Sequence, residues 1–310
     1  TQVTPSCICG FEQCKQQILF LVNIQIHLYL FPLVIFFVSI QLIAQDKPAY
    51  ALFDSSGKPT TYQAMLDTLN NRKDVILFGE MHDNPIAHWL ELEVTQDLAS
   101  TKTLILGAEM IEADNQKQLN AYLSDSINLK QLDSTARLWV NHKTDYQPLV
   151  DFAKNNSLQF IATNVPRRYA SMVYKEGFEV LDSLPSEEKE WIAPLPIAFD
   201  PELPRYQEIL KMMGDHGSPK LVMAQAIKDA TMAHFILQNI EENKVFIHYN
   251  GSFHSDFHEG ILWYLKNGAP KLNYTTITSV AQKDLDTLEE AYLNQADFII
   301  VIDEDMTKTY

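Results

Sequence analysis

Apolar positions along the chain gather into short, nearly continuous runs that alternate with amphipathic stretches. Residues 74–80 (DVILFGE) and 103–110 (TLILGAEM) are two such runs. Runs of this length are typical of strands that are buried on both faces of a parallel sheet. The same pattern predicts further strands at about 158–165, 244–250, 274–280 and 297–302. Because these runs alternate with helical patterns, the sequence predicts an α/β fold, a parallel sheet flanked by helices with right-handed crossovers.

Helical periodicity fills the segments between the runs. Asn84 and Pro85 open one helix, since proline suits the first helical position. A longer helix is predicted at about 219–242. Two stretches, about 111–143 and about 180–218, carry helical segments without a strand. We expect them to form a smaller all-helical subdomain against the sheet.

The most apolar segment of the chain runs from Ile18 to Ala44 and gives way at once to polar residues at Gln45. Such a change is typical of a signal peptide, so we expect an exported protein in the periplasm, on the cell surface or secreted. The alternative is a membrane-anchoring helix, because the run is about long enough to span a bilayer. Residues 1–45 are thus a signal peptide or an N-terminal extension with a wrongly assigned start. Residues 46–310 form the α/β domain, with its motif-bearing core at about 74–268.

The net charge and the cysteine content exclude several classes of function and site. The chain holds 40 acidic and 24 basic residues, a net charge of −16. This balance argues against binding to nucleic acid or to an anionic membrane surface. The three cysteines, Cys7, Cys9 and Cys14, all precede the apolar segment, which excludes a disulfide framework or a cysteine zinc site in the body of the protein.

Polar side chains follow three of the predicted strands. Glu80 and His82 come after the first strand, Glu109 after the second and His254 after the fourth. Ligands of open parallel sheets bind beyond the carboxyl ends of the strands, so we expect these four side chains to converge in one pocket. Two carboxylates and two imidazoles suit general acid–base catalysis or a divalent metal such as zinc or manganese. In a hydrolase, Glu80 would activate water and either histidine would stabilise developing charge.

A purely structural interpretation applies to several of these residues. Glu80, Asp83 or Asn84 could cap the helix that starts at Pro85. Function is favoured for the four strand-end residues because such groups recur at three separate strands. A structural role is favoured for the remaining histidines considered, which are His88, His142, His216, His234 and His258.

Two further features suggest binding. Arg167 and Arg168 open a helix after the third strand, where helix amides and guanidinium groups make an anion site suited to carboxylates such as haem propionates. Surface pairing of these arginines with acidic residues is the alternative. Asp229 lies among apolar residues on one face of the long helix, where it could hydrogen-bond a pocket residue such as His82 or Arg167. The alternative is that it belongs to a polar stripe at the boundary of that face.

Taken in order, these motifs resemble the ChaN-like haem-binding uptake family of the Tiki superfamily. The resemblance spans roughly Asp74 to Gly268. It rests on Gly79-Glu80-Met81-His82-Asp83-Asn84, Gly107-Ala108-Glu109-Met110, Tyr146-Gln147-Pro148-Leu149, the segment from Ala162 to Arg168, the segment from Ala224 to Ala233, and Gly251-Ser252-Phe253-His254.

The resemblance implies a haem-binding protein of haem or iron uptake. The family's namesake is an iron-regulated surface lipoprotein that holds haem between two subunits with a tyrosine on the iron, so a homodimer around haem is expected. Tyr169 is the predicted iron ligand, Tyr174 the second choice, and Arg167, Arg168, His82, His254 and Asp229 complete the predicted haem site. This sequence has no lipid-anchor cysteine after its apolar segment. The superfamily also contains metal-dependent proteases and esterases. The alternative function is therefore a hydrolase that uses Glu80, His82, Glu109 and His254.

Overall fold

The computed structural model describes residues 47–71, 74–214 and 217–310. Within it, Ala49–Tyr310 form one compact unit. The predicted signal peptide falls outside the described residues. Among the described residues, no helix has the length and apolar character that a membrane span requires.

A seven-stranded sheet forms the centre of this unit, with strand order β1-β7-β6-β2-β5-β3-β4. The six predicted strands are all present, and neighbours among them pair in parallel. The order places β5 between β2 and β3, so the three strands whose ends carry the predicted site lie side by side. The six are β2 (Val75–Glu80), β3 (Thr103–Glu112), β4 (Gln159–Asn164), β5 (Lys244–Gly251), β6 (Tyr274–Gln282) and β7 (Phe298–Asp303).

The sheet has one strand that the sequence analysis did not predict. β1 (Tyr50–Asp54) pairs antiparallel with β7 at the edge, so the sheet is mixed and not wholly parallel. A helix that follows, α2 (Tyr62–Asn70), was also missed. β1 has only two buried residues, Leu52 and Phe53. Two adjacent buried residues do not show the alternation of apolar and polar positions by which a strand is recognised in a sequence.

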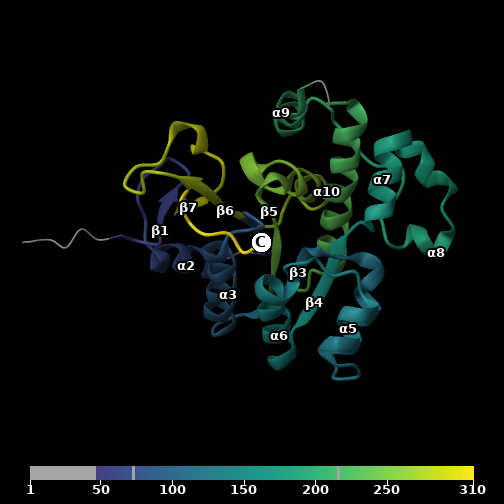
Figure 1. The fold of residues 1–310 in the computed structure, drawn as a ribbon, viewed down its shortest axis with the longest axis horizontal. Helices are drawn as coiled ribbons and strands as arrows, with labels where there is room; N and C mark the ends of the chain where they lie inside the picture. Colours follow the sequence, from purple (N-terminus) through teal and green to yellow (C-terminus); the bar gives the residue numbers. More distant parts are fainter. Residues whose placement is uncertain (1–46, 72–73, 215–216) are drawn as a thin grey trace, which may run out of the picture. The chain divides into compact units, whose positions relative to one another are not determined.

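Helices cover both faces of the sheet (Figure 1). Alternate residues of β2 point to opposite faces, as in any strand. Ile76 and Phe78 join the core beneath α2, α3 and α6, whereas Val75 and Leu77 pack with α10 and α11. The helices are α3 (Pro85–Ala99), α6 (Gln147–Asn155), α7 (Arg167–Glu176), α10 (Pro219–Asn239) and α11 (Ile261–Gly268).

The two strand-free stretches are helical, as predicted, and belong to the same compact unit. The first contains short helices around α4 and α5, and the second lies between α7 and α10. Their helices are α4 (Gln116–Leu123), α5 (Leu129–Thr135), α8 (Ser186–Lys189) and α9 (Pro204–Met213), with shorter turns at Ala113–Asn115, His142–Tyr146 and Phe178–Ser183.

Candidate functional site

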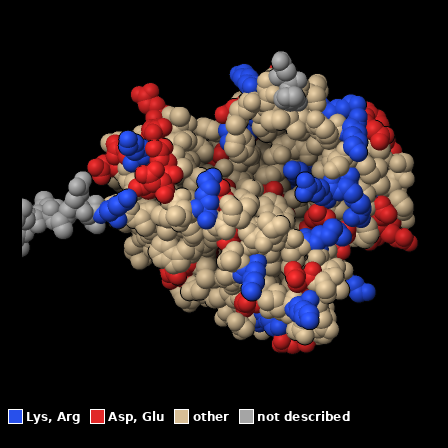
Figure 2. Space-filling view, viewed as in Figure 1, with Lys and Arg blue, Asp and Glu red and all other residues tan. Residues whose placement is uncertain are grey.

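A cavity of about 660 Å³ opens at the carboxyl ends of β2, β3 and β5. Its volume lies within the range of small-molecule sites. Figure 2 shows a recess in this face of the molecule, with Lys and Arg side chains gathered on the side toward α7. All four strand-end residues of the sequence analysis line the cavity, namely Glu80, His82, Glu109 and His254.

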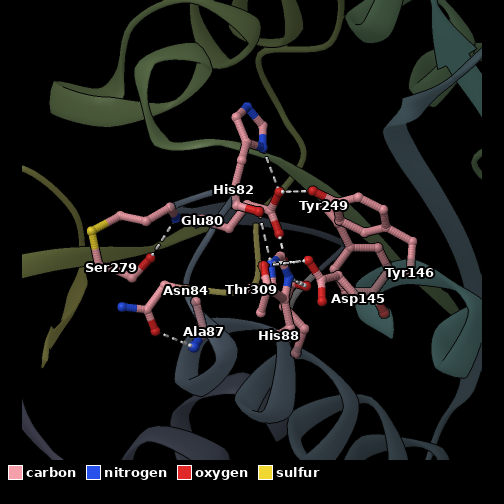
Figure 3. Close-up of polar contacts among 12 residues, drawn as sticks. Glu80, His82, Asn84, Ala87, His88, Asp145, Tyr146, Tyr249, Ser279 and Thr309 are labelled. Carbon is pink, nitrogen blue, oxygen red and sulfur yellow. Dashed lines mark hydrogen bonds and ion pairs between the residues drawn. The ribbon is translucent and has the colours of Figure 1, made fainter. Parts of the chain in front are cut away.

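Glu80 and His82 form the first pair in the cavity wall. Glu80 Oε1 lies 2.6 Å from His82 Nδ1 and accepts a 2.8 Å hydrogen bond from Tyr146 (Figure 3). Burial would raise the pKa of Glu80, but His82 and His88 outweigh it and lower that pKa. Burial would likewise lower the pKa of His82, and the hydrogen bond with Glu80 and the charge of Glu109 raise it instead. The pair is therefore held with Glu80 ionised.

His88 and Glu91, from α3, lie on the other side of Glu80. His88 Nδ1 is 2.9 Å from Glu80 Oε2 and 3.4 Å from Glu91 Oε2. Contact with these carboxylates overcomes burial and raises the pKa of His88 to about 11. Burial and the charge of Glu80 raise the pKa of Glu91. The structural role predicted for His88 is thus too narrow, because this histidine belongs to the cluster around Glu80.

Glu109 and His254 form the second pair, which Asp229 extends. His254 Nε2 lies 3.1 Å from Glu109 Oε1, and His254 Nδ1 bonds to Asp229. Asp229 in turn accepts a 2.8 Å hydrogen bond from Tyr206. Burial would lower the pKa of His254, but the two carboxylates raise it to about 9. Asp229 therefore contacts a pocket residue, as predicted, but that residue is His254 and not His82 or Arg167.

The two pairs meet at Gly251, the last residue of β5. Its N–H donates to Glu109 Oε2 at 2.8 Å. A Cβ at this position would lie 2.6 Å from His82 Nε2 and 3.5 Å from Glu109 Oε2. The absence of a side chain at Gly251 therefore allows His82 to pack close to β5, beside Glu109. In this respect the four predicted residues do converge in one polar pocket.

We expect Gly251→Ala to displace the His82 imidazole while the fold is kept. Gly251 has φ −56°, which alanine adopts without strain. The clash is with the end of a side chain that can rotate, so the loss of stability should be about 1 kcal/mol. Histidine ring NMR and thermal unfolding of the variant measure both effects. Unchanged His82 resonances would contradict the predicted crowding.

A bulge helps to aim Glu109 into the cavity. The pairing of β3 with β4 shifts register between Ala108 and Glu112, and Glu109 lies in this irregular stretch. Bulges re-aim side chains near functional sites. A continuous ladder would have alternated these positions strictly between the faces of the sheet.

A profile of the family described as haem-binding uptake, Tiki superfamily, ChaN matches residues 65–265 of this chain. The chain belongs to the ChaN family. The matched region contains every side chain of the Glu80 and Glu109 groups described above. It confirms the family that the ordered motifs resemble.

Comparison with individual proteins agrees with this membership at the level of the fold. The structure of ChaN from Campylobacter jejuni, reported with cofacial haem binding, superimposes with a TM-score of 0.63 and 17% identity, over 83% of this chain and 98% of that chain. RETICULATA-RELATED 5, a chloroplastic protein of Arabidopsis thaliana, is 27% identical over 185 residues, which are 54% of this chain. The matched part covers 25% of that plant protein's length.

The two arginines of this ChaN family member differ in their surroundings. Arg167 lines the cavity. Arg168 points elsewhere: it pairs with Asp114 at 2.6 Å and lies 4.4 Å from the centre of the Tyr169 ring. The prediction of an anion site made by both arginines is therefore wrong for Arg168, whose charge is already neutralised.

The predicted iron ligands do not line the cavity. Tyr169 is 1% exposed, and its hydroxyl donates to Glu188 at 2.5 Å and accepts from Arg168 at 2.8 Å. Tyr174 is exposed and is likewise absent from the cavity wall. Of the tyrosines in the described parts of the chain, Tyr310 is the one that lines it. The position of Tyr169 on α7 therefore directs its side chain into the neighbouring hydrophobic core and not into the cavity.

The residue that caps the N-terminus of α3 is not one of the four predicted site residues. Asn84 caps α3 through Oδ1, which accepts from Ile86 N at 2.9 Å and Ala87 N at 3.2 Å. Glu80 and Asp83, the other capping candidates, are not the N-cap of this helix. Glu80 is thereby left free to interact with the histidines.

Several residues of the cavity wall were not predicted from the sequence. Lys228 precedes Asp229 on α10, and Trp139 packs against His82 with ring centres 4.8 Å apart. Lys228 could have been found from the sequence as a positively charged residue beside the apolar face of the long helix. Trp139 comes from an irregular segment after α5, where no periodicity marks the direction of a side chain.

Proposed function

We propose that this protein binds haem in the cavity, with His82 Nε2 as the iron ligand, as part of haem or iron uptake. The observation that carries the proposal is the pair of Glu80 and His82. A histidine that binds a metal usually donates its other ring N–H to a carboxylate, which fixes the ring and makes it more basic. Here Nδ1 is bound to Glu80, and Nε2 makes no hydrogen bond to the residues described.

The space beside Nε2 fits this role. The His82 side chain is 33% exposed, whereas that of His254 is 6% exposed and has both ring nitrogens engaged by carboxylates. Gly251 lets the His82 ring lie close to the end of β5, because a Cβ at this position would be 2.6 Å from Nε2. Imidazole is a common axial ligand of haem iron. Of the two cavity histidines, His82 is therefore the one available to a ligand.

The rim of the cavity suits an amphiphilic, anionic ring system. Trp139 and Phe253 supply aromatic surface, and Arg167 and Lys228 supply positive charge. Within the described ranges 47–71, 74–214 and 217–310, neither of these two cations forms an ion pair. In a chain with a net charge of −16, two unpaired cations at one cavity favour a ligand with carboxylates, as in the haem propionates.

The hydrolase alternative has less support from the geometry. A general base must reach a water molecule with a free oxygen. Glu80 is 1% exposed, its Oε1 contacts His82 and Tyr146, and its Oε2 lies 2.9 Å from His88 Nδ1. The same carboxylate is well placed to orient His82. Orientation of a ligand histidine therefore accounts for Glu80 better than activation of water does.

We expect Arg167→Ala and Lys228→Ala each to weaken haemin binding about tenfold, because a charge-assisted hydrogen bond contributes about 1.5–3 kcal/mol when partly shielded. Arg168→Ala is the matched control, since Arg168 is paired with Asp114 outside the cavity. Haemin titrations followed by visible absorption measure the affinities. Equal losses in Arg168→Ala and Arg167→Ala would contradict the assigned propionate site, and an absence of saturable haemin binding by the parent would overturn the proposed function.

A further inference from the structure

Beneath the haem cavity lies a second group of potential ligands, formed by Glu80, His88 and Glu91. Each offers one atom, and these atoms all lie within 4.8 Å of one another. β2 ends in Glu80, while His88 and Glu91 are three residues apart on α3 and so share one face of that helix. We propose that these three side chains bind one divalent transition-metal ion, zinc by preference, in a site separate from the haem iron.

The distances suit such an ion. His88 Nδ1 lies 2.9 Å from Glu80 Oε2 and 3.4 Å from Glu91 Oε2. Around a tetrahedral zinc ion with bonds of about 2.0–2.2 Å, neighbouring ligand atoms are about 3.3 Å apart. The side chains therefore need only small movements to surround an ion.

Two buried oxygen atoms in this group lack a hydrogen-bond partner. They are Glu80 Oε2 and Glu91 Oε1, and both side chains are 0% exposed. Glu80 Oε2 does form an ion pair with His88 Nδ1 at 2.9 Å, whereas Glu91 Oε1 has no such partner among the described residues. Buried carboxylate oxygens are costly unless they are paired or bind a metal. The unpartnered oxygen of Glu91 therefore points to a cation between β2 and α3.

The surroundings of His88 match those of a metal ligand. Its Nε2 lies 3.1 Å from the carbonyl oxygen of His82 and 3.4 Å from Asp145 Oδ2, so this nitrogen has acceptors for its proton (Figure 3). A metal ion that displaces the proton of Nδ1 would meet a lone pair that faces Glu80 and Glu91. A carbonyl or carboxylate behind a ligand histidine is the usual outer partner in metal sites.

Charge and ligand chemistry identify the class of ion. Once an ion displaces the proton of His88 Nδ1 and any proton on Glu91, the imidazole and the two carboxylates carry two negative charges, which a divalent ion balances. One nitrogen and two oxygen ligands suit zinc, which commonly takes three protein ligands and a water. Manganese accepts more oxygen but binds such sites more weakly than zinc.

Glu80 connects the proposed metal to the haem site through its two oxygens. Oε1 contacts His82 and Tyr146, and Oε2 faces His88. The metal would thus fix the carboxylate that orients His82. Its binding does not require haem, so the two sites can be tested independently.

The test uses the purified haem-free chain, equilibrated with zinc or with manganese, desalted and analysed for metal. We expect the parent to retain one zinc ion per chain. Glu91→Gln keeps the shape of the side chain and should lower zinc affinity by more than the 10- to 100-fold that loss of an outer partner costs. Glu93→Gln, on the same helix but outside the group, is the matched control and should bind zinc like the parent.

Two further measurements distinguish zinc bound by Glu80, His88 and Glu91 from zinc bound by the Glu109 group. His254→Gln alters the Glu109 group and should leave zinc binding intact. Cobalt(II) added to the folded parent should give the visible bands of a tetrahedral site, a readout that needs no variant. The proposal is overturned if the parent retains no metal and shows no cobalt bands. It is equally overturned if Glu91→Gln binds zinc as tightly as the parent, or if His254→Gln loses the metal while Glu91→Gln keeps it. Haemin titration of Glu91→Gln reports separately on the proposed function.

Discussion

Replacement of His82 by alanine is expected to weaken haemin binding by more than 100-fold and to change the absorption spectrum of what remains bound. The reason is that the variant loses the ring nitrogen proposed to bind the iron, whereas loss of an outer partner alone costs about 10- to 100-fold in metal affinity. Folding should change little, because the side chain is 33% exposed and lies at the cavity wall. Titration with haemin, followed by visible absorption, measures both the affinity and the ligand signature.

Two variants make this result specific. His234→Ala removes an imidazole from α10 that does not line the cavity, and should bind haemin like the parent. Tyr169→Phe tests the ligand predicted from the sequence, and should also be unaffected because the Tyr169 hydroxyl faces Glu188. Loss of the parent spectrum in Tyr169→Phe or Tyr310→Phe, with His82→Ala unchanged, would assign the iron to a tyrosine and overturn the role of His82.

Replacement of Asp229 by alanine is expected to destabilise the protein by about 3–5 kcal/mol, the usual cost of removing one partner from a buried ion pair. Asp229 is fully buried, and its loss leaves His254 Nδ1 and the Tyr206 hydroxyl without their acceptor. Asp229→Asn keeps a hydrogen-bonding side chain and removes only the charge. Its loss of stability should therefore be smaller.

The pH dependence of stability reports on the same interaction. The pKa of His254 is about 9 in the folded protein, above the ordinary histidine value of 6.5. A raised pKa in the folded state stabilises it fully below pH 6.5, and this contribution is lost as the pH rises through about 9. The parent should therefore lose stability across this interval, and Asp229→Asn should lose less. Chemical denaturation at a series of pH values compares the two, and parallel curves would show that Asp229 does not hold the proton of His254.

Much of the architecture could be predicted from the local pattern of apolar and polar residues along the chain. Buried strands such as 75–80 and 103–112 have continuous apolar runs because both faces of the sheet are covered by helices. Polar residues at the ends of such runs are conspicuous, and strand ends in a parallel sheet are neighbours in space. For this reason Glu80, His82, Glu109 and His254 could be assigned to one pocket from their positions alone. The edge strand β1 was not accessible, since its pairing with β7 joins segments more than 240 residues apart along the chain.

Directions of side chains, in contrast, were decided by tertiary packing. Arg167 and Arg168 are adjacent in sequence, but one lines the cavity and the other pairs with Asp114. His88 resembled an ordinary helical histidine until α3 packed against the end of β2 and placed it beside Glu80. The sequence by itself determined the fold class, the family and the strand ends that carry the pocket, because apolar period and strand-end position are local properties. Only the tertiary structure decided which partner each polar group has, because a partner is set by the packing of segments far apart along the chain.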